Sequence, residues 1–163
     1  MNADTPRRRS QLAWALNDWA NSAFATTVLV GFFPIFFKQY WAKDLAPTDA
    51  TLYLGFGNSA AAFLVMLLSP WLGALADRLA AKKRFLAMFT AIGVIGTFAL
   101  AFIGPGQWQL AIIVFALASV GFFGGLTFND ALLVNVATRD EADRVSAFGY
   151  GLGYLGGGLV FLA

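Results

Sequence analysis

The chain has 163 residues, of which 59% are hydrophobic and 12% are charged, and its net charge is +2. Soluble domains usually carry about 25% charged residues, so this composition favours a lipid bilayer as the main solvent. The absence of Cys and His excludes disulfides, thiolate metal sites and the usual catalytic base. We therefore expect no enzyme activity, catalytic residue, metal or cofactor, and no nucleic-acid partner, because the basic residues form no single cluster.

Five apolar runs are long enough to cross a bilayer, which takes about 20 residues each. Short polar connections separate them, so the expected fold is an all-α transmembrane bundle of antiparallel helices. The runs do not alternate with period two, which makes a β-barrel a poor alternative. A polar tail, 1–12, precedes the bundle of residues 13–163. The expected spans are 13–37, 52–76, 85–104, 108–136 and 145–163.

Basic residues predict the orientation of this bundle. Nine of the 11 Lys and Arg residues lie in the tail and in the connections 77–84 and 138–144. The connection 38–51 holds the other two. Because Lys and Arg accumulate on the cytoplasmic side of membrane proteins, we expect a cytoplasmic N-terminus.

The first span opens with "LNDWANSAF", which puts an acid and two amides into an apolar run. A carboxylate at the centre of a membrane helix costs about 2.5–3.5 kcal/mol, so Asp18 needs a partner or water. We interpret the polar face as the lining of an aqueous cavity that includes Asp18, Asn21 and Ser22. Hydrogen bonding between helices is the alternative. At 100° per residue, one stripe collects Trp14, Asp18, Asn21, Ser22, Ala25 and Leu29.

The fourth span carries a second polar pair, Asn129 and Asp130, in "LTFNDALLVNV". Their depth from the expected cytoplasmic side is similar to that of Asp18. In a chain without His, Asp18 and Asp130 are the candidate proton carriers. We place Asn129 and Asp130 in the same expected cavity, with capping or hydrogen bonding of a neighbouring helix as the alternative.

The fifth span holds three glycines at four-residue spacing, Gly149, Gly153 and Gly157. This spacing removes side chains from one helix face and predicts close packing against another helix. Static packing and sliding during a conformational change are both compatible with the pattern.

The connection "GALADRLAAKKR", residues 73–84, resembles the signature loop between helices two and three of the major facilitator superfamily, Gly-x-Leu-Ala-Asp-Arg-x-Gly-Arg-Arg/Lys. Ala80 stands where that signature has Gly. In the superfamily the acid and the basic residues are thought to latch the two halves of the transporter. The resemblance therefore implies a gating loop. The matching positions are Gly73, Leu75, Asp77, Arg78 and Lys82.

A narrower resemblance links "LNDWANSAF" and "FNDALLVNV…DRVSAFGYGLGYLGGGL" to the vacuolar amino-acid effluxer branch and its bacterial relatives. Val134 stands where Pro is usual, and Asn129-Asp130 where Tyr-Asn is usual. The resemblance implies the front part of an N-terminal six-helix half, with a C-terminal transporter half to follow. The matching positions in the fifth span are Ser146, Gly149, Gly153, Tyr154, Gly156 and Gly157.

This resemblance implies secondary active transport of a small molecule by alternating access, with an amino acid or related metabolite as substrate and efflux as the direction. Protons are the candidate coupling ion, and the bacterial inner membrane is favoured over the vacuolar membrane. The alternative function is a non-transporting integral membrane scaffold or assembly subunit, because helix packing alone also accounts for the glycines and amides.

Overall fold

The structure is a computed structural model that describes residues 4–162. Five helical segments in this range are long and apolar enough to cross a membrane, which confirms the predicted all-α bundle. The first segment is continuous from Asp4 to Trp41 and includes two π-helical stretches. The elements are α1 (Asp4–Ala23), a π-helix (Phe24–Phe32), α2 (Phe33–Phe36), a second π-helix (Phe37–Trp41), α3 (Pro47–Arg78), α4 (Lys82–Leu100), α5 (Trp108–Val136) and α6 (Arg139–Leu162).

The two π-helical stretches of the first segment, whose turns are wider than those of an α-helix, lie on either side of Pro34. The amide of Phe33 donates to the carbonyl of Val28, five residues earlier, and the amide of Ala42 donates to that of Phe37 at 2.7 Å. Proline lacks an amide hydrogen and its ring clashes with the carbonyl four residues before it, so a regular α-helix cannot pass this point undisturbed. Wide turns of this kind are common at functional sites of helices.

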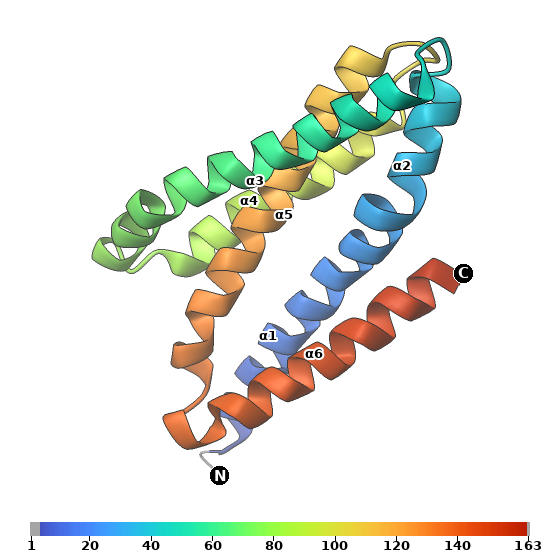
Figure 1. The fold of residues 1–163 in the computed structure, drawn as a ribbon. Helices are drawn as coiled ribbons and strands as arrows, with labels where there is room; N and C mark the ends of the chain where they lie inside the picture. Colours follow the sequence, from blue (N-terminus) through green and yellow to red (C-terminus); the bar gives the residue numbers. More distant parts are fainter. Residues whose placement is uncertain (1–3, 163) are drawn as a thin grey trace.

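The helices form two groups, seen in Figure 1. In the first group α5 packs against α4 and α3, and in the second α1 packs against α6. The groups are joined where α1 contacts α5. The start of α1 lies near the turn between α5 and α6 (Figure 1), whereas the connections from α2 to α3 and from α4 to α5 lie together at the opposite end.

That opposite end is closed by hydrogen bonds between its two connections. The indole of Trp41 donates to the carbonyl of Ile103 at 3.0 Å, and the amide of Gly106 donates to the carbonyl of Tyr40 at 3.2 Å. Gly106 has φ +79°, a conformation that favours glycine. Beneath this contact the rings of Phe33 and Phe115 stack with centroids 3.7 Å apart.

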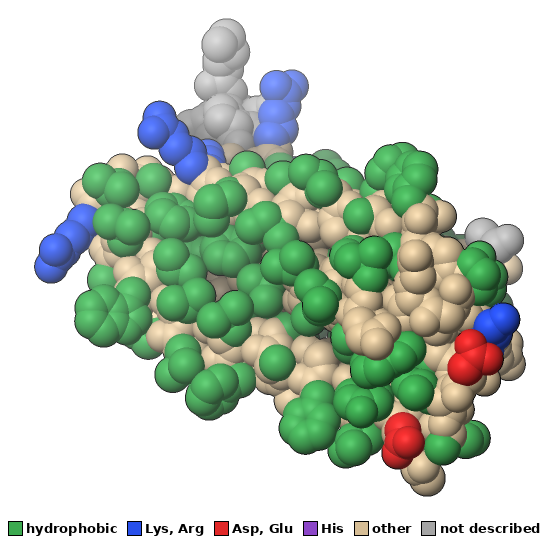
Figure 2. Space-filling model, turned by 90° about the horizontal axis from the view of Figure 1, so that it is seen from above, with side chains coloured by type: hydrophobic (Ala, Val, Ile, Leu, Met, Phe, Trp, Pro, Cys, Tyr) green, Lys and Arg blue, Asp and Glu red, His purple; other side chains and the backbone are tan. Residues whose placement is uncertain are grey.

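The surface matches a protein surrounded by lipid. Hydrophobic side chains cover most of the face in Figure 2, and the charged side chains lie around its edge. Large apolar residues are widely exposed on the helices, including Trp71 at 79%. A soluble protein rarely exposes so much contiguous apolar surface, so the described helices belong to an integral membrane protein.

Candidate functional site

Asp18 lies in the contact between α1 and α6, where it is only 8% exposed. A Cβ atom added at Gly153 of α6 would lie 3.4 Å from Oδ2 of Asp18 and 2.6 Å from Oγ of Ser22. Glycine at position 153 therefore leaves the space that the hydroxyl of Ser22 occupies, and it lies within contact distance of Asp18. The two side chains follow each other by one helical turn, so they line the same part of α6.

The other two glycines of the predicted packing face also receive side chains of the first segment, one from α1 and one from the π-helix that follows it. The ring of Trp14 occupies the space beside Gly149, and Thr26 occupies the space beside Gly157. The hydroxyl of Thr26 donates a hydrogen bond to the carbonyl of Gly157 at 3.2 Å. The glycine face of α6 thus contacts a face of α1 and of the following π-helix that is aromatic at its start and polar further along.

Asp130 lies on α5 and is exposed. The helix α5 contacts α1, which carries Asp18. Like charges repel more strongly in a low-dielectric surrounding than in water, so this pair is costly when both groups are ionised. Within residues 4–162, neither carboxylate has a basic partner, because the ion pairs there lie at the ends of helices.

Asn129 connects α5 to α1 through its backbone. Its carbonyl accepts a hydrogen bond of 2.7 Å from the indole nitrogen of Trp14. Asn129 is 1% exposed, and its amide nitrogen and oxygen have no hydrogen-bond partner among the described residues. The sequence predicted a polar role for Asn129, but it contained no signal for this contact with Trp14.

Asn21 faces a different neighbour from Asp18 and Ser22. Its amide nitrogen donates to Oδ1 of Asn17 at 3.2 Å, and both residues line a groove of about 460 Å³. The groove lies between α1 with the π-helix that follows it, α4 and α5, and Val160 of α6 also lines it. The predicted single stripe is therefore divided between two surfaces of α1. This division follows from helix geometry, since Asn21 and Ser22 are about 100° apart.

The groove also holds polar groups that the sequence analysis did not select. The hydroxyl oxygens of Thr27 and Thr90 are buried there and have no hydrogen-bond partner among the described residues. Thr97 lines the same groove, but its hydroxyl donates to the carbonyl of Gly93 at 2.7 Å. Threonine is common in membrane helices for packing reasons alone, so its presence in these spans gave no distinctive signal.

The turn between α3 and α4 contains the residues of the predicted gating loop. Nζ of Lys82 lies 2.8 Å from Oδ1 of Asp77, so the pair bridges the end of α3 and the start of α4. The amide of Ala81 donates to the carbonyl of Ala76 at 2.8 Å and the amide of Ala80 to that of Asp77 at 3.2 Å, a Schellman motif. Ala80 has φ +48° in this motif.

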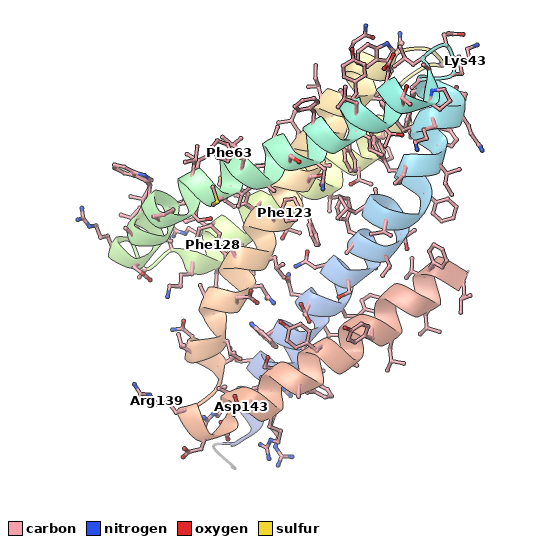
Figure 3. All side chains as sticks on the ribbon, viewed as in Figure 1. Lys43, Phe63, Phe123, Phe128, Arg139 and Asp143 are labelled. Carbon is pink, nitrogen blue, oxygen red and sulfur yellow. The ribbon has the colours of Figure 1, made fainter. Side chains whose placement is uncertain are left out.

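Two other predicted loop residues make no close contact within the described part of the chain. Arg78 is exposed, and the ion pair of this turn is made by Lys82 instead. A Cβ atom added at Gly73 would meet nothing within 4 Å. Outside this turn, Arg7 of α1 pairs with Glu141 in the first part of α6, where Figure 3 labels Arg139 and Asp143.

The sequence of the chain matches a known family over residues 46–140, described as vacuole effluxer Atg22 like. The chain belongs to the vacuole effluxer Atg22-like family. This membership confirms the resemblance to the effluxer branch of the major facilitator superfamily. No solved structure matches the chain.

Two curated relatives of this Atg22-like chain are bacterial. An uncharacterized MFS-type transporter, YxiO of Bacillus subtilis (strain 168), is 37% identical over 155 residues, which cover 94% of this chain and 36% of the relative. An uncharacterized protein of Aquifex aeolicus (strain VF5) is 29% identical over 167 residues, which cover 100% of this chain and 41% of the relative. The chain thus spans about two-fifths or less of the length of these relatives.

Proposed function

We propose that the full-length Atg22-like protein is a secondary active transporter that moves an amino acid or related metabolite, in the direction of efflux, by alternating access. In such transporters two helical halves rock about a site near the middle of the membrane. The described helices would supply most of one half, and a C-terminal half would supply the other. The bacterial relative named as an MFS-type transporter supports this class of function.

The observation that carries the proposal is the pair of acids that lie within the predicted membrane spans, away from the ends of their helices. Asp18 and Asp130 lie on two helices that contact each other and have no basic partner among residues 4–162. Acids at membrane depth are costly and usually mark a path for a solute or an ion. Glycine at position 153 makes room for the hydroxyl of Ser22, one turn from Asp18 on the same face of α1.

The remaining parts of the proposal concern the cavity, the coupling ion and the membrane. Asn21, Ser22 and Asn129 would contribute polar groups to the solute path, and protons would bind at Asp18 and Asp130. The concentration of Lys and Arg in the tail and two connections supports a cytoplasmic N-terminus. The bacterial relatives support an inner-membrane location.

Replacing Asp18 by Asn in the full-length protein tests the function. We expect Asp18→Asn to lower the transport of labelled amino acids into proteoliposomes at least tenfold, because the amide cannot ionise or exchange a proton at neutral pH. Uptake is measured with and without an imposed pH gradient. Asp49→Asn is the matched control, since Asp49 lies in the exposed first turn of α3.

The scaffold alternative predicts a different result. If no labelled amino acid accumulates with the unmodified protein under either condition, the substrate class is wrong. If transport occurs but Asp18→Asn and Asp49→Asn transport equally well, Asp18 has no part in the mechanism and its polar surroundings serve helix packing.

The proposed latch has its own test. Asp77→Ala removes the pair with Lys82, so we expect the two ends of the transporter to open with altered frequency. A cysteine introduced at position 130 of a cysteine-free full-length protein should then react severalfold faster or slower with a membrane-impermeant maleimide. Lys83→Gln, at an exposed neighbour with no ion pair among the described residues, should leave the rate unchanged. Equal rates in Asp77→Ala and unmodified protein would remove the latch.

A further inference from the structure

Trp14 forms a buried hydrogen bond between two helices that carry the acids. Its indole nitrogen donates to the carbonyl of Asn129 at 2.7 Å, and the two residues are 7% and 1% exposed. Water cannot compete for this bond at such burial, so it is stronger and more rigid than the same bond at the surface. A second bond between α1 and α5, from Gln11 to the carbonyl of Val136, is longer at 3.2 Å and only partly buried.

The position of this bond relates directly to the two acids. Asp18 follows Trp14 by one turn of α1, about 6 Å along the helix axis. Asp130 directly follows Asn129 on α5. A bond between Trp14 and the backbone of Asn129 therefore sets how α1 and α5 are aligned within one turn of both carboxylates.

The ring of Trp14 is also held on its other side. It fills the space beside Gly149 of α6, and it packs in an apolar cluster with Leu132 of α5 and Val145 of α6. Three helices therefore meet at this one side chain. Its orientation is fixed by packing, so the indole hydrogen points to one carbonyl.

We infer that Trp14 is a positioning residue for the proposed transport site, whose indole hydrogen bond to the backbone of Asn129 holds Asp18 and Asp130 at a fixed separation. This inference rests on the proposed function for its biological meaning. The geometric claim can be tested without any substrate. The donor of this bond, Trp14, lies outside the sequence patterns that indicated the family.

The charged surroundings of the pair make the separation measurable. Among the described residues, α4 carries its charges at its first turn, α3 at its two ends, and α6 before Val145. The glycine stretch of α6 against Asp18 contains only Tyr150 and Tyr154 as titratable groups, and both are exposed. The charges of these three helices therefore lie toward the helix ends rather than beside the two carboxylates.

The experiment measures this influence by chemical labelling of the full-length protein in liposomes. Dicyclohexylcarbodiimide modifies protonated carboxyl groups in apolar surroundings, and mass spectrometry gives the pH of half-maximal labelling at Asp18. We expect Asp130→Asn to move this pH by about 1 unit when Trp14 is present, because coupled carboxyls influence each other on this scale. In a Trp14→Phe background the same change should move it by less than half as much.

Matched variants separate the hydrogen bond from the size of the ring. Trp19→Phe is the control, since Trp19 packs against Gly156 of α6 and donates no hydrogen bond among the described residues; it should retain the full shift. If Trp14→Phe does not fold, benzothienylalanine incorporated at position 14 keeps the shape of tryptophan and lacks the donor. An undiminished shift in either position-14 variant overturns the inference.

Failure of the inference and failure of the proposed function give different results. Loss of the shift in Trp14 variants supports positioning even if no labelled amino acid is transported. An unchanged shift combined with loss of transport in Asp18→Asn leaves the proposed function intact and removes only the role of Trp14.

Discussion

The two main helix contacts of this Atg22-like chain are both built on glycine, but they use it differently. Between α4 and α5 the glycines lie on both helices, and a Cβ atom at Gly96 would be 3.0 Å from Cβ of Ala118. Between α1 and α6 the glycines lie on α6 alone, and the α1 side chains opposite them include Asp18 and Ser22. The first contact brings backbones together, whereas the second makes room for polar side chains.

This difference shows that a glycine pattern does not by itself identify a role. Small residues let membrane helices approach each other closely, and the sequence contains glycines in both contacts. What distinguishes them is the chemistry of the facing helix. Apolar Phe89 and the backbone of Gly93 face α5, so that contact is suited to rigid packing. Costly polar groups face α6, so that contact is suited to function.

The largest effect is expected from Gly121→Ala in the α4–α5 contact. The added methyl group would overlap backbone atoms of Gly93 and the carbonyl of Phe89, which have no flexible end that can move aside. Overpacking of this kind costs about 1–3 kcal/mol and sometimes more. We expect a large loss of monodisperse full-length protein and a lower Tm in detergent.

Gly125→Ala is the control for this change, because its Cβ atom would lie 3.8 Å from Oγ1 of Thr90, an ordinary contact. It should fold like the unmodified protein. If Gly121→Ala and Gly125→Ala have the same Tm, the α4–α5 contact is not the rigid one and the comparison between the two contacts loses its basis.

A smaller effect on stability and a larger one on transport is expected from Gly153→Ala in the α1–α6 contact. The methyl group would press on the hydroxyl of Ser22, which can rotate, and would approach Asp18. We expect a loss of stability of about 1 kcal/mol, at the lower end for overpacking, but a severalfold loss of amino-acid transport in proteoliposomes. The double variant Gly153→Ala with Ser22→Ala should recover the Tm, because it removes the overlapping oxygen.

Gly151→Ala gives the baseline for this pair, since nothing lies within 4 Å of its added Cβ atom. A transport rate in Gly153→Ala equal to that in Gly151→Ala would mean that the α1–α6 contact serves packing alone, as the α4–α5 contact does.

The sequence was sufficient to predict the fold class, because long apolar runs with short polar connections permit few arrangements in a bilayer. It also indicated the polar residues of the interior, since an acid such as Asp18 is conspicuous in an apolar span. It could not assign partners to faces. Helix periodicity placed Asn21 with Asp18, but the structure places Asn21 beside Asn17 in the groove next to α4.

The missing information is tertiary. The side chain of Trp14 donates to a backbone carbonyl. Because every residue type has such a carbonyl, no residue pattern in α5 predicts the bond. The π-helical stretches around Pro34 depend on how the chain recovers its hydrogen bonds after the proline, which varies with its neighbours. Contacts of these two kinds appear only when the helices are assembled.

The smallest effect is expected from Ala80→Gly, which separates glycine as a source of space from glycine as a source of backbone freedom. Gly106 takes positive φ in the α4–α5 turn, whereas the α3–α4 turn places Ala80 at φ +48°. Glycine at this left-handed position should raise the free energy of unfolding by about 1–2 kcal/mol, because it has no Cβ atom to clash. The greater conformational freedom of glycine in the unfolded chain lowers that free energy again by about 0.4–1 kcal/mol. The net gain should raise the Tm of the full-length protein slightly.

Ala81→Gly, at φ −113°, has no strain to relieve and should not raise the Tm. If both variants lower the Tm equally, the turn is unstrained, and glycine in this chain matters for the space it leaves between helices rather than for the backbone angles it permits.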